Sequence, residues 1–196
     1  MKLFKFFKSQ KGFTLIELLV VIGVLGILAT GLLATIDPLE QFRKGSDSNE
    51  KTSSLELVNA LTRYYAVHNT FPWYAAADGG AGCNGGTPPA PTQVTGLAQG
   101  VTTTFNDCLT TLESEGELKT TFHSQNSILG HLWVVDTTPT GSTSKSVSVC
   151  FHPDSKSEQS KATTNYATAN VANGPTVPLA QTCTAASGSN CFECTQ

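Results

Sequence analysis

The chain has 196 residues, of which 39% are apolar and only 14% are charged, and its formal net charge is −3. This length and composition allow one modest domain beside a membrane helix and exclude a multidomain enzyme. Residues 1–12 carry four of the 12 basic residues and no acid, so the remainder has 8 basic and 15 acidic residues, or −7. We therefore expect no nucleic-acid partner.

The first 12 residues form a basic leader. Its lysines lie at positions 2, 5, 8 and 11, ahead of an apolar run. This charge bias keeps the N-terminus in the cytoplasm and sends the rest of the chain across the membrane. An ordinary secretory signal has a shorter apolar run, followed by a cleavage site of small residues. Here a small residue, Gly12, comes before the apolar run instead. The alternative is a secretory signal that is cleaved at residues 29–31 or near Ala34, which would release a soluble protein.

Residues 13–36 are predicted to form a single transmembrane helix. Fifteen of these 24 residues are Phe, Leu, Ile or Val, and Glu17 has the one ionisable side chain. At ~1.5 Å per residue the helix reaches roughly 36 Å, which exceeds the ~30 Å hydrocarbon core of a bilayer. The apolar residues contribute roughly −5 to −9 kcal/mol toward insertion, against a cost on the order of 3 kcal/mol for the carboxylate.

The start of this run carries a specific motif. The string KGFTLIEL at positions 11–18, behind a basic leader and ahead of an apolar helix, resembles the processing site of type IV pilins and type II secretion pseudopilins. The resemblance implies that a prepilin peptidase cleaves after Gly12 and methylates the new N-terminus at Phe13. It also implies an α+β fold, in which a long N-terminal transmembrane and amphipathic helix packs on a small antiparallel β-sheet.

The charge of Glu17 supports the same interpretation on physical grounds. Cleavage after Gly12 creates a cationic amine at Phe13. A carboxylate in hydrocarbon is tolerable when a cation on a neighbouring subunit neutralises it, which makes Glu17 an assembly and register device. The alternative is that Glu17 lies unpaired at the level of the lipid headgroups.

Glycines and one proline are predicted to give the first helix flexibility. Each glycine weakens a helix by ~1 kcal/mol relative to alanine, and in assembled pilins the corresponding region loses regular structure ahead of a proline. Asp37 is alternatively a cap, with the proline as the first residue of a new helix. The positions concerned are Gly23, Gly26, Gly31 and Pro38.

Residues 37–68 are predicted to continue the first helix as an amphipathic segment. Leu55, Val58, Leu61 and Tyr65 recur at helical spacing and predict an apolar stripe that faces a packed partner. Residues 44–54 contain no apolar side chain, so we expect a solvated helical neck there, or a joint at Gly45. The exported head then occupies residues 69–196, and the aromatic-proline pair at 71–72 resembles the end of that helix in pseudopilins.

The head is predicted to begin with a variable loop, at residues 69–104, followed by a short helix within residues 105–118. We expect Asn106 or Asp107 to cap this helix, and Leu109 and Leu112 to be buried. The Gly-Gly pairs of the loop lack the lysine and flanking elements of a phosphate site. Acidic residues at 113, 115 and 117 most often form a solvated surface. We expect no cofactor, although some related pseudopilins bind calcium in this general part of the fold.

Two β-rich runs, at residues 131–136 and 146–151, are predicted to form an antiparallel hairpin. A further edge strand is expected within residues 166–179. The side chains that we expect to meet the helix stripe, depending on register, are Trp133, Val135, Val147, Val149 and Phe151.

Six cysteines follow the apolar run, at Cys83, Cys108, Cys150, Cys183, Cys191 and Cys194. An even number in an exported domain with little core predicts a disulfide framework. We favour a bridge between Cys83 and Cys108, because they flank the loop, and closure of the C-terminal tail by the other four. The alternatives for residues 191–194 are a redox dithiol or half of a zinc site, but neither a thioredoxin-like unit nor a second ligand pair accompanies them.

These features predict a structural subunit of a type IV pilus-like filament rather than an enzyme. The resemblance implies a homo-oligomeric helical filament, with a prepilin peptidase, an inner-membrane platform protein and an assembly ATPase as partners. The subunit would lie in the cytoplasmic membrane as a single-pass protein before it enters a periplasmic or extracellular filament. The alternative function is a signal-anchored exported domain with a cysteine-rich tail that binds a ligand or has thiol activity.

Overall fold

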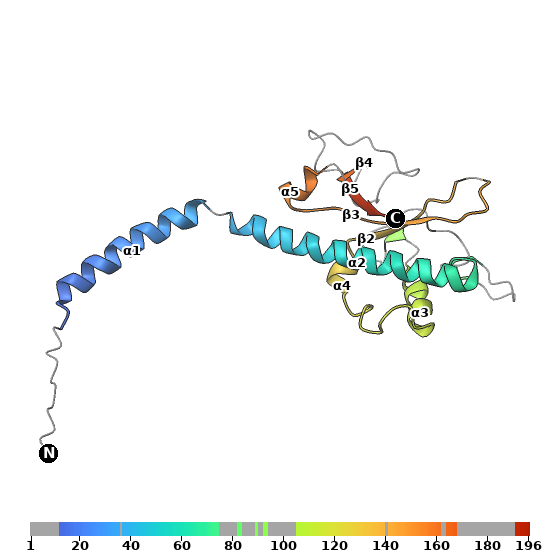
Figure 1. Ribbon diagram of the computed structural model, residues 1–196, viewed down its shortest axis with the longest axis horizontal. Helices are drawn as coiled ribbons and strands as arrows, with labels where there is room; N and C mark the ends of the chain where they lie inside the picture. Colours follow the sequence, from blue (N-terminus) through green and yellow to red (C-terminus); the bar gives the residue numbers. More distant parts are fainter. Residues whose placement is uncertain are drawn as a thin grey trace, which may run out of the picture. The chain divides into compact units, whose positions relative to one another are not determined.

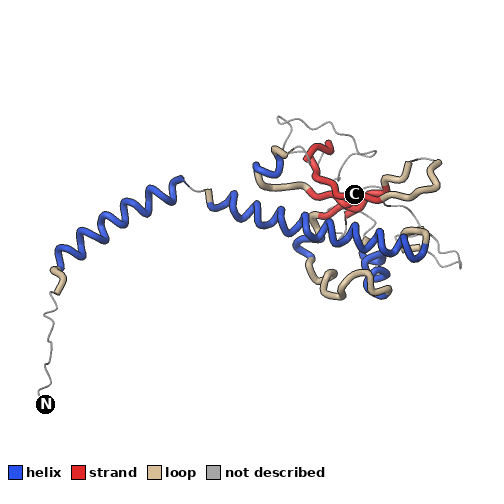
Figure 2. The backbone as a smooth tube through the Cα atoms, viewed as in Figure 1, coloured by secondary structure: helices blue, strands red, loops and turns tan. Residues whose placement is uncertain are grey.

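The computed structural model describes residues 12–35, 37–74, 82–83, 89, 92–93, 105–139, 141–161, 164–167 and 191–196. The chain divides into two compact units, Met1–Leu39 and Glu40–Gln196. Helices and an antiparallel sheet, coloured by type in Figure 2, give the α+β fold that the sequence predicts.

The first unit is built on helix α1, Leu15–Thr35. Within it, Leu15–Leu33 is long and apolar enough to cross a membrane, and no other helix in the described part of the chain meets that test. All its polar side chains bond locally. The Thr30 hydroxyl, for example, donates to the Gly26 and Ile27 carbonyls at 3.1 and 2.9 Å. Such internal bonding is what an apolar surrounding requires.

Helix α2, Pro38–His68, is separate from α1. Proline suits the first helical position because its missing N–H would have no partner there. The Leu39 N–H donates to the Asp37 carboxylate at 3.2 Å. Asp37 and Pro38 therefore begin a new helix, which is the alternative given above for this pair, and no joint occurs at Gly45 because α2 continues through it.

The buried face of α2 differs from the predicted stripe. Val58 and Leu61 are buried as expected, but Leu55 is 43% exposed and Leu57 and Tyr64 take its place in the core. The predicted neck is wrong as well. Four of its polar residues are buried, namely Asp47, Glu50, Ser53 and Ser54. Polar groups of the head bond the side chains of Asp47, Glu50 and Ser54.

The sheet has the strand order β1-β2-β3-β5-β4, and every pair is antiparallel. Its strands are β1 Thr92–Gln93, β2 Leu132–Asp136, β3 Val147–Phe151, β4 Thr164–Ala167 and β5 Cys191–Thr195. The β2–β3 hairpin is confirmed. The sequence predicts only a cysteine-rich tail at β5, yet this strand lies between β3 and β4. Strand β4, at the edge of the sheet, overlaps the expected edge strand at residues 166–167, and the remainder of that prediction lies outside the described residues.

The register of the hairpin decides which side chains meet α2. Val134 pairs with Val149 and Leu132 with Phe151, and these four side chains join the α2 core cluster. The prediction for Val147, Val149 and Phe151 is confirmed. The prediction for Trp133 and Val135 is wrong, because they point to the opposite face, where they pack with Cys150 and Phe192.

Three short helices complete the head: α3 Asn106–Ser114, α4 Asn126–Leu129 and α5 Lys156–Gln159. Figure 1 shows α2 along the sheet, with α3 and α4 beside it. Leu109 and Leu112 are buried, as predicted. The predicted cap of α3 is wrong, since the residue at the cap is Phe105 and no side chain bonds there. Phe105 is instead buried, in ring contact with Trp73.

Disulfides hold both ends of the head. Cys83 bonds Cys108, the favoured pair, and Cys150 bonds Cys194 across the β3–β5 pair. Cys191 is also disulfide-bonded, and Cys183 lies outside the described residues. Next to Cys83, a side chain on Gly82 would collide with the Trp73 backbone. This close approach requires glycine.

Candidate functional site

The N-terminus of α1 is organised by Thr14 and Glu17. The Thr14 N–H and hydroxyl both donate to Glu17 Oε2, at 2.9 and 2.7 Å, and the Glu17 N–H donates back to the Thr14 hydroxyl at 3.3 Å. This reciprocal arrangement is a capping box, which satisfies N–H groups that a helix start leaves free. The sequence reasoning missed it, although the Thr-x-x-Glu spacing is a known signal.

The rest of α1 is a surface without a partner within the described chain. Its large apolar side chains, together with Phe13, are between 50% and 86% exposed. A Cβ built on Gly23, Gly26 or Gly31 would contact nothing within 4 Å. The space beside these glycines is therefore open. The predicted flexibility of the helix at these positions stays a prediction. The helix can lower its free energy only by entering lipid or by packing against other apolar helices.

The three predicted residues at the amino-terminal end thus lie along one short stretch. Gly12 and Phe13 are exposed ahead of the helix, and Glu17 follows in its first turn. A peptidase could reach the bond after Gly12 without unfolding any described element. Cleavage, methylation and pairing with a neighbouring subunit remain predictions for these residues.

A second polar site attaches α2 to the head. Asp47 is 1% exposed, and its carboxylate accepts from the Asp154 N–H at 2.9 Å and from the Ser155 N–H and hydroxyl at 2.9 and 2.5 Å. Nearby, Lys51 Nζ bonds Glu193 at 2.5 Å. These contacts span more than 100 residues of sequence, so nothing local in residues 44–54 predicts them.

His131 provides the titratable member of this attachment. Its Nδ1 lies 2.7 Å from Glu50 Oε1, and Glu50 is 2% exposed. The hydrogen bond to Glu50 raises the pKa of His131 above its usual range, and the nearby Asp154 adds to the effect, while burial opposes it. The pair joins α2 to the residue that precedes β2.

The acidic side chains at positions 113, 115 and 117 do not come together as a metal site among the described residues. Glu113 accepts from the His123 N–H at 3.1 Å, and Glu117 pairs with Arg63 at 2.8 Å. Among the described residues, no three His, Cys, Asp or Glu side chains come together as a metal site. Calcium stays untested, because part of the chain lies outside the description.

The C-terminal cysteine pair is not a dithiol. Residues three apart in a strand point to opposite faces, so Cys191 and Cys194 in β5 cannot bond each other directly. Cys194 bonds Cys150 instead. Both are disulfide-bonded, as are the other three described cysteines. The interpretation as a redox centre or half a zinc site has no support in this arrangement.

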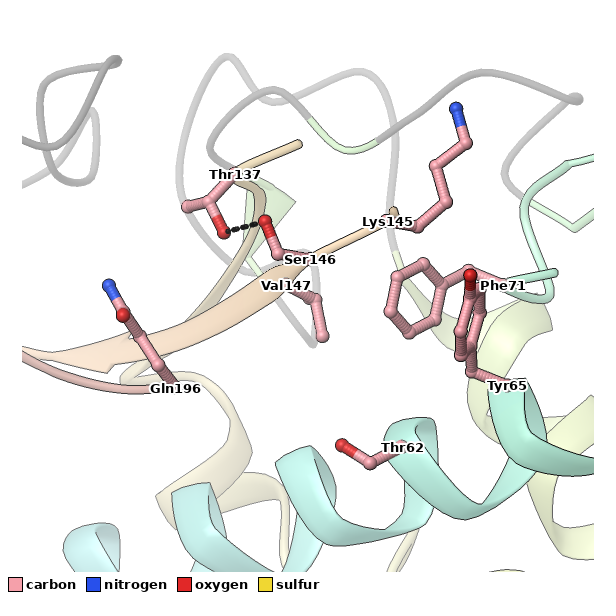
Figure 3. Close-up of a pocket in the computed structure, with 8 residues that line it drawn as sticks. All are labelled: Thr62, Tyr65, Phe71, Thr137, Lys145, Ser146, Val147 and Gln196. Atoms are coloured by element: carbon pink, nitrogen blue, oxygen red, sulfur yellow. Dashed lines mark hydrogen bonds between the residues drawn. The ribbon is translucent and has the colours of Figure 1, made fainter. Parts of the chain in front are cut away.

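A pocket of about 340 Å³ opens between the end of α2 and the β2–β3 hairpin. Figure 3 shows that the Thr137 hydroxyl donates to the Ser146 hydroxyl on the hairpin side of this pocket. The Thr62 hydroxyl donates to the carbonyl of its own helix, and the Lys145 ammonium lies 4.6 Å from the Tyr74 ring centre. Three of the lining hydroxyl groups thus bond within the protein, and the pocket defines no ligand.

A family model matches the amino-terminal part of the chain. Residues 7–33 match the family model described as the prokaryotic N-terminal methylation motif. This segment covers the end of the leader, the capping box and the candidate membrane span. Neither the curated proteins nor the solved structures gave a significant match.

Proposed function

Because the chain carries the prepilin-type methylation motif of type IV pilins and pseudopilins, we propose that it is a structural subunit of a type IV pilus-like filament. It is a pilin or a type II secretion pseudopilin, without catalytic activity of its own. The match of residues 7–33 is the observation that carries the proposal. A prepilin peptidase cleaves after Gly12 and methylates Phe13, which leaves Glu17 as the fifth residue.

Assembly follows from the exposed surface of α1. Before assembly the helix is stored in the cytoplasmic membrane with the head exported. Transfer into the filament exchanges lipid contacts for contacts with other copies of α1, and small residues such as Gly23, Gly26 and Gly31 permit close helix packing. The energy comes from outside the subunit, from an assembly ATPase acting through an inner-membrane platform protein.

Glu17 sets the stagger between subunits in this mechanism. Its carboxylate is already bonded to Thr14 in the isolated chain. A neighbouring Phe13 amine therefore supplies the missing countercharge while Thr14 keeps the carboxylate oriented. Replacing the charge should reduce filament yield while the helix still inserts, since a neutral side chain enters lipid at lower cost.

Intact-mass measurement of the purified protein tests processing. We expect loss of residues 1–12 and the mass of one added methyl group. Retention of the leader would contradict the proposal and favour a signal-anchored exported domain. The Gly12→Val variant serves as the control, because it should keep the leader in the same cells.

A filament assay tests Glu17. We expect the Glu17→Gln variant to be processed and inserted normally but to form few filaments. Thr30→Val is the matched control, because it also removes a polar group of α1 that bonds only within its own helix. Undiminished filament yield from Glu17→Gln would refute the role of the charge.

A further inference from the structure

The first turns of α2 carry an apolar and basic surface that has no partner within the described chain. Leu39 and Phe42 are 64% and 76% exposed, and Arg43 and Lys44, which follow in sequence, are exposed. We name these four residues the basic–apolar patch. Glu40, in the same turns, accepts from the Ser157 N–H of the head at 3.3 Å. At 100° per residue, Phe42 lies about 200° around the helix from Glu40 and so faces away from the head. Leu39 and Arg43 lie on the sides next to Phe42, whereas Lys44 lies closer to the side of Glu40.

The two cations of the patch lack an acidic partner in the described residues. The other cations of α2 are paired, Lys51 with Glu193 and Arg63 with Glu117. No such ion pair involves Arg43 or Lys44. This lack is notable in a chain whose mature part carries a net charge of −7.

Chain length places the patch near the bilayer. Helix α1 has 21 residues, so at ~1.5 Å per residue it is about 32 Å long. The ~30 Å hydrocarbon core of a bilayer therefore takes up nearly its whole length. Only residues 34–37 separate the candidate span from Pro38. These steps reach at most about 17 Å, and the patch occupies the next two turns.

We propose that the basic–apolar patch binds anionic phospholipid headgroups on the exported face of the membrane. Phe42 and Leu39 lie at the boundary between headgroups and acyl chains, and Arg43 binds lipid phosphates with its apolar stem along the same boundary. Lys44, on another side of the helix, binds phosphates of the headgroup layer that surrounds the start of α2. The inference rests on the proposed function, because it concerns the membrane-stored subunit before assembly.

A lipid surface fits the patch better than a second copy does. Outside α1 and α2, the described part of the head has no exposed large apolar side chain that could cover Phe42. Another α1 offers apolar side chains, but its one acid is Glu17, at the far end of the helix. An anionic bilayer supplies an apolar boundary and a layer of phosphates together.

Lipid binding would fix the beginning of α2 at the membrane surface. The head, joined to α2 through Asp47 and its neighbours, would then be held in a defined orientation before assembly. Entry into a filament would require release of these headgroups, so the lipid composition of the membrane would regulate how readily the subunit leaves it.

Tryptophan quenching in vesicles tests the proposal with the full mature chain. The native Trp73 and Trp133 are buried in the head and give a low background. Three single variants, Leu25→Trp, Phe42→Trp and Val67→Trp, are reconstituted in vesicles of phosphatidylcholine and phosphatidylglycerol with brominated acyl chains. Val67 is the matched control, because it is an exposed apolar residue near the other end of α2.

We expect strong quenching for Leu25→Trp and for Phe42→Trp, with the latter at least about threefold above Val67→Trp. Adding Arg43→Gln and Lys44→Gln should reduce the quenching of Phe42→Trp in anionic vesicles and leave it unchanged in phosphatidylcholine alone. Lys119→Gln, which removes another exposed lysine, is the charge control and should have no effect. Raising the salt concentration should also reduce the quenching of Phe42→Trp in anionic vesicles, because salt screens the attraction between the two cations and the lipid phosphates.

The outcomes separate this inference from the proposed function. If Leu25→Trp is quenched but Phe42→Trp equals Val67→Trp, the patch does not touch lipid and the inference fails alone. If quenching of Phe42→Trp is independent of anionic lipid, binding of headgroup phosphates is refuted. If Leu25→Trp itself is not quenched, α1 does not insert and the proposed function fails.

Discussion

The buried carboxylate of Asp47 allows a direct test of how α2 is attached to the head. In the Asp47→Asn variant the amide has the same size but keeps only one acceptor oxygen. If that oxygen faces Ser155, the new NH₂ group faces the Asp154 N–H, and that hydrogen bond is lost. The two hydrogen bonds from Ser155 remain, but their acceptor is then neutral. Hydrogen bonds to charged groups contribute about 1.5–3 kcal/mol each. Allowing for the desolvation that the charge no longer costs, we expect a loss of about 2–4 kcal/mol in unfolding free energy.

Urea unfolding of the full mature chain in detergent micelles measures this loss, with the fluorescence of the two buried tryptophans as the signal. The matched control is Glu115→Gln, which also removes one negative charge but at an exposed side chain that lies 3.9 Å from the His68 ring nitrogen Nε2. We expect the control to stay within about 0.5 kcal/mol of the parent. If Asp47→Asn matched the control, the carboxylate would not hold the head on α2, and the neck would be solvated as the sequence first indicated.

Two further predictions concern the head. Because Glu50 raises the pKa of His131, the protonated pair stabilises the fold fully below the unfolded value of about 6.5, and this contribution is lost as pH rises through the higher folded value. The difference in urea midpoint between the parent and His131→Gln should therefore shrink from about pH 6 to about pH 8.5; a constant difference would refute the pairing. Leu61→Ala should cost about 2–5 kcal/mol in the same assay, since Leu61 is fully buried. Leu55→Ala, at an exposed position of the same helix, should cost less than about 1 kcal/mol, and equal losses would contradict the observed helix face.

The sequence by itself determined the amino-terminal motif, the apolar helix and the β2–β3 hairpin. The methylation motif at residues 7–33 and the apolar helix α1 both depend on residues that are close together in the chain. The β2–β3 hairpin follows from alternation and turn residues in the same way. Each of these features involves residues close together in the chain, so their pattern can be read without knowing the fold.

Only the tertiary structure decided how the head is built. Residues 44–54 look solvated because their side chains are polar, but a polar side chain can be buried when a distant segment supplies its hydrogen bonds. For Asp47 that segment is 107 residues away. Likewise, β5 pairs between β3 and β4, and the hairpin register turns Trp133 away from α2. Strand order and register depend on pairing between segments that are far apart in the chain, and the hydrophobic pattern of one segment cannot specify them.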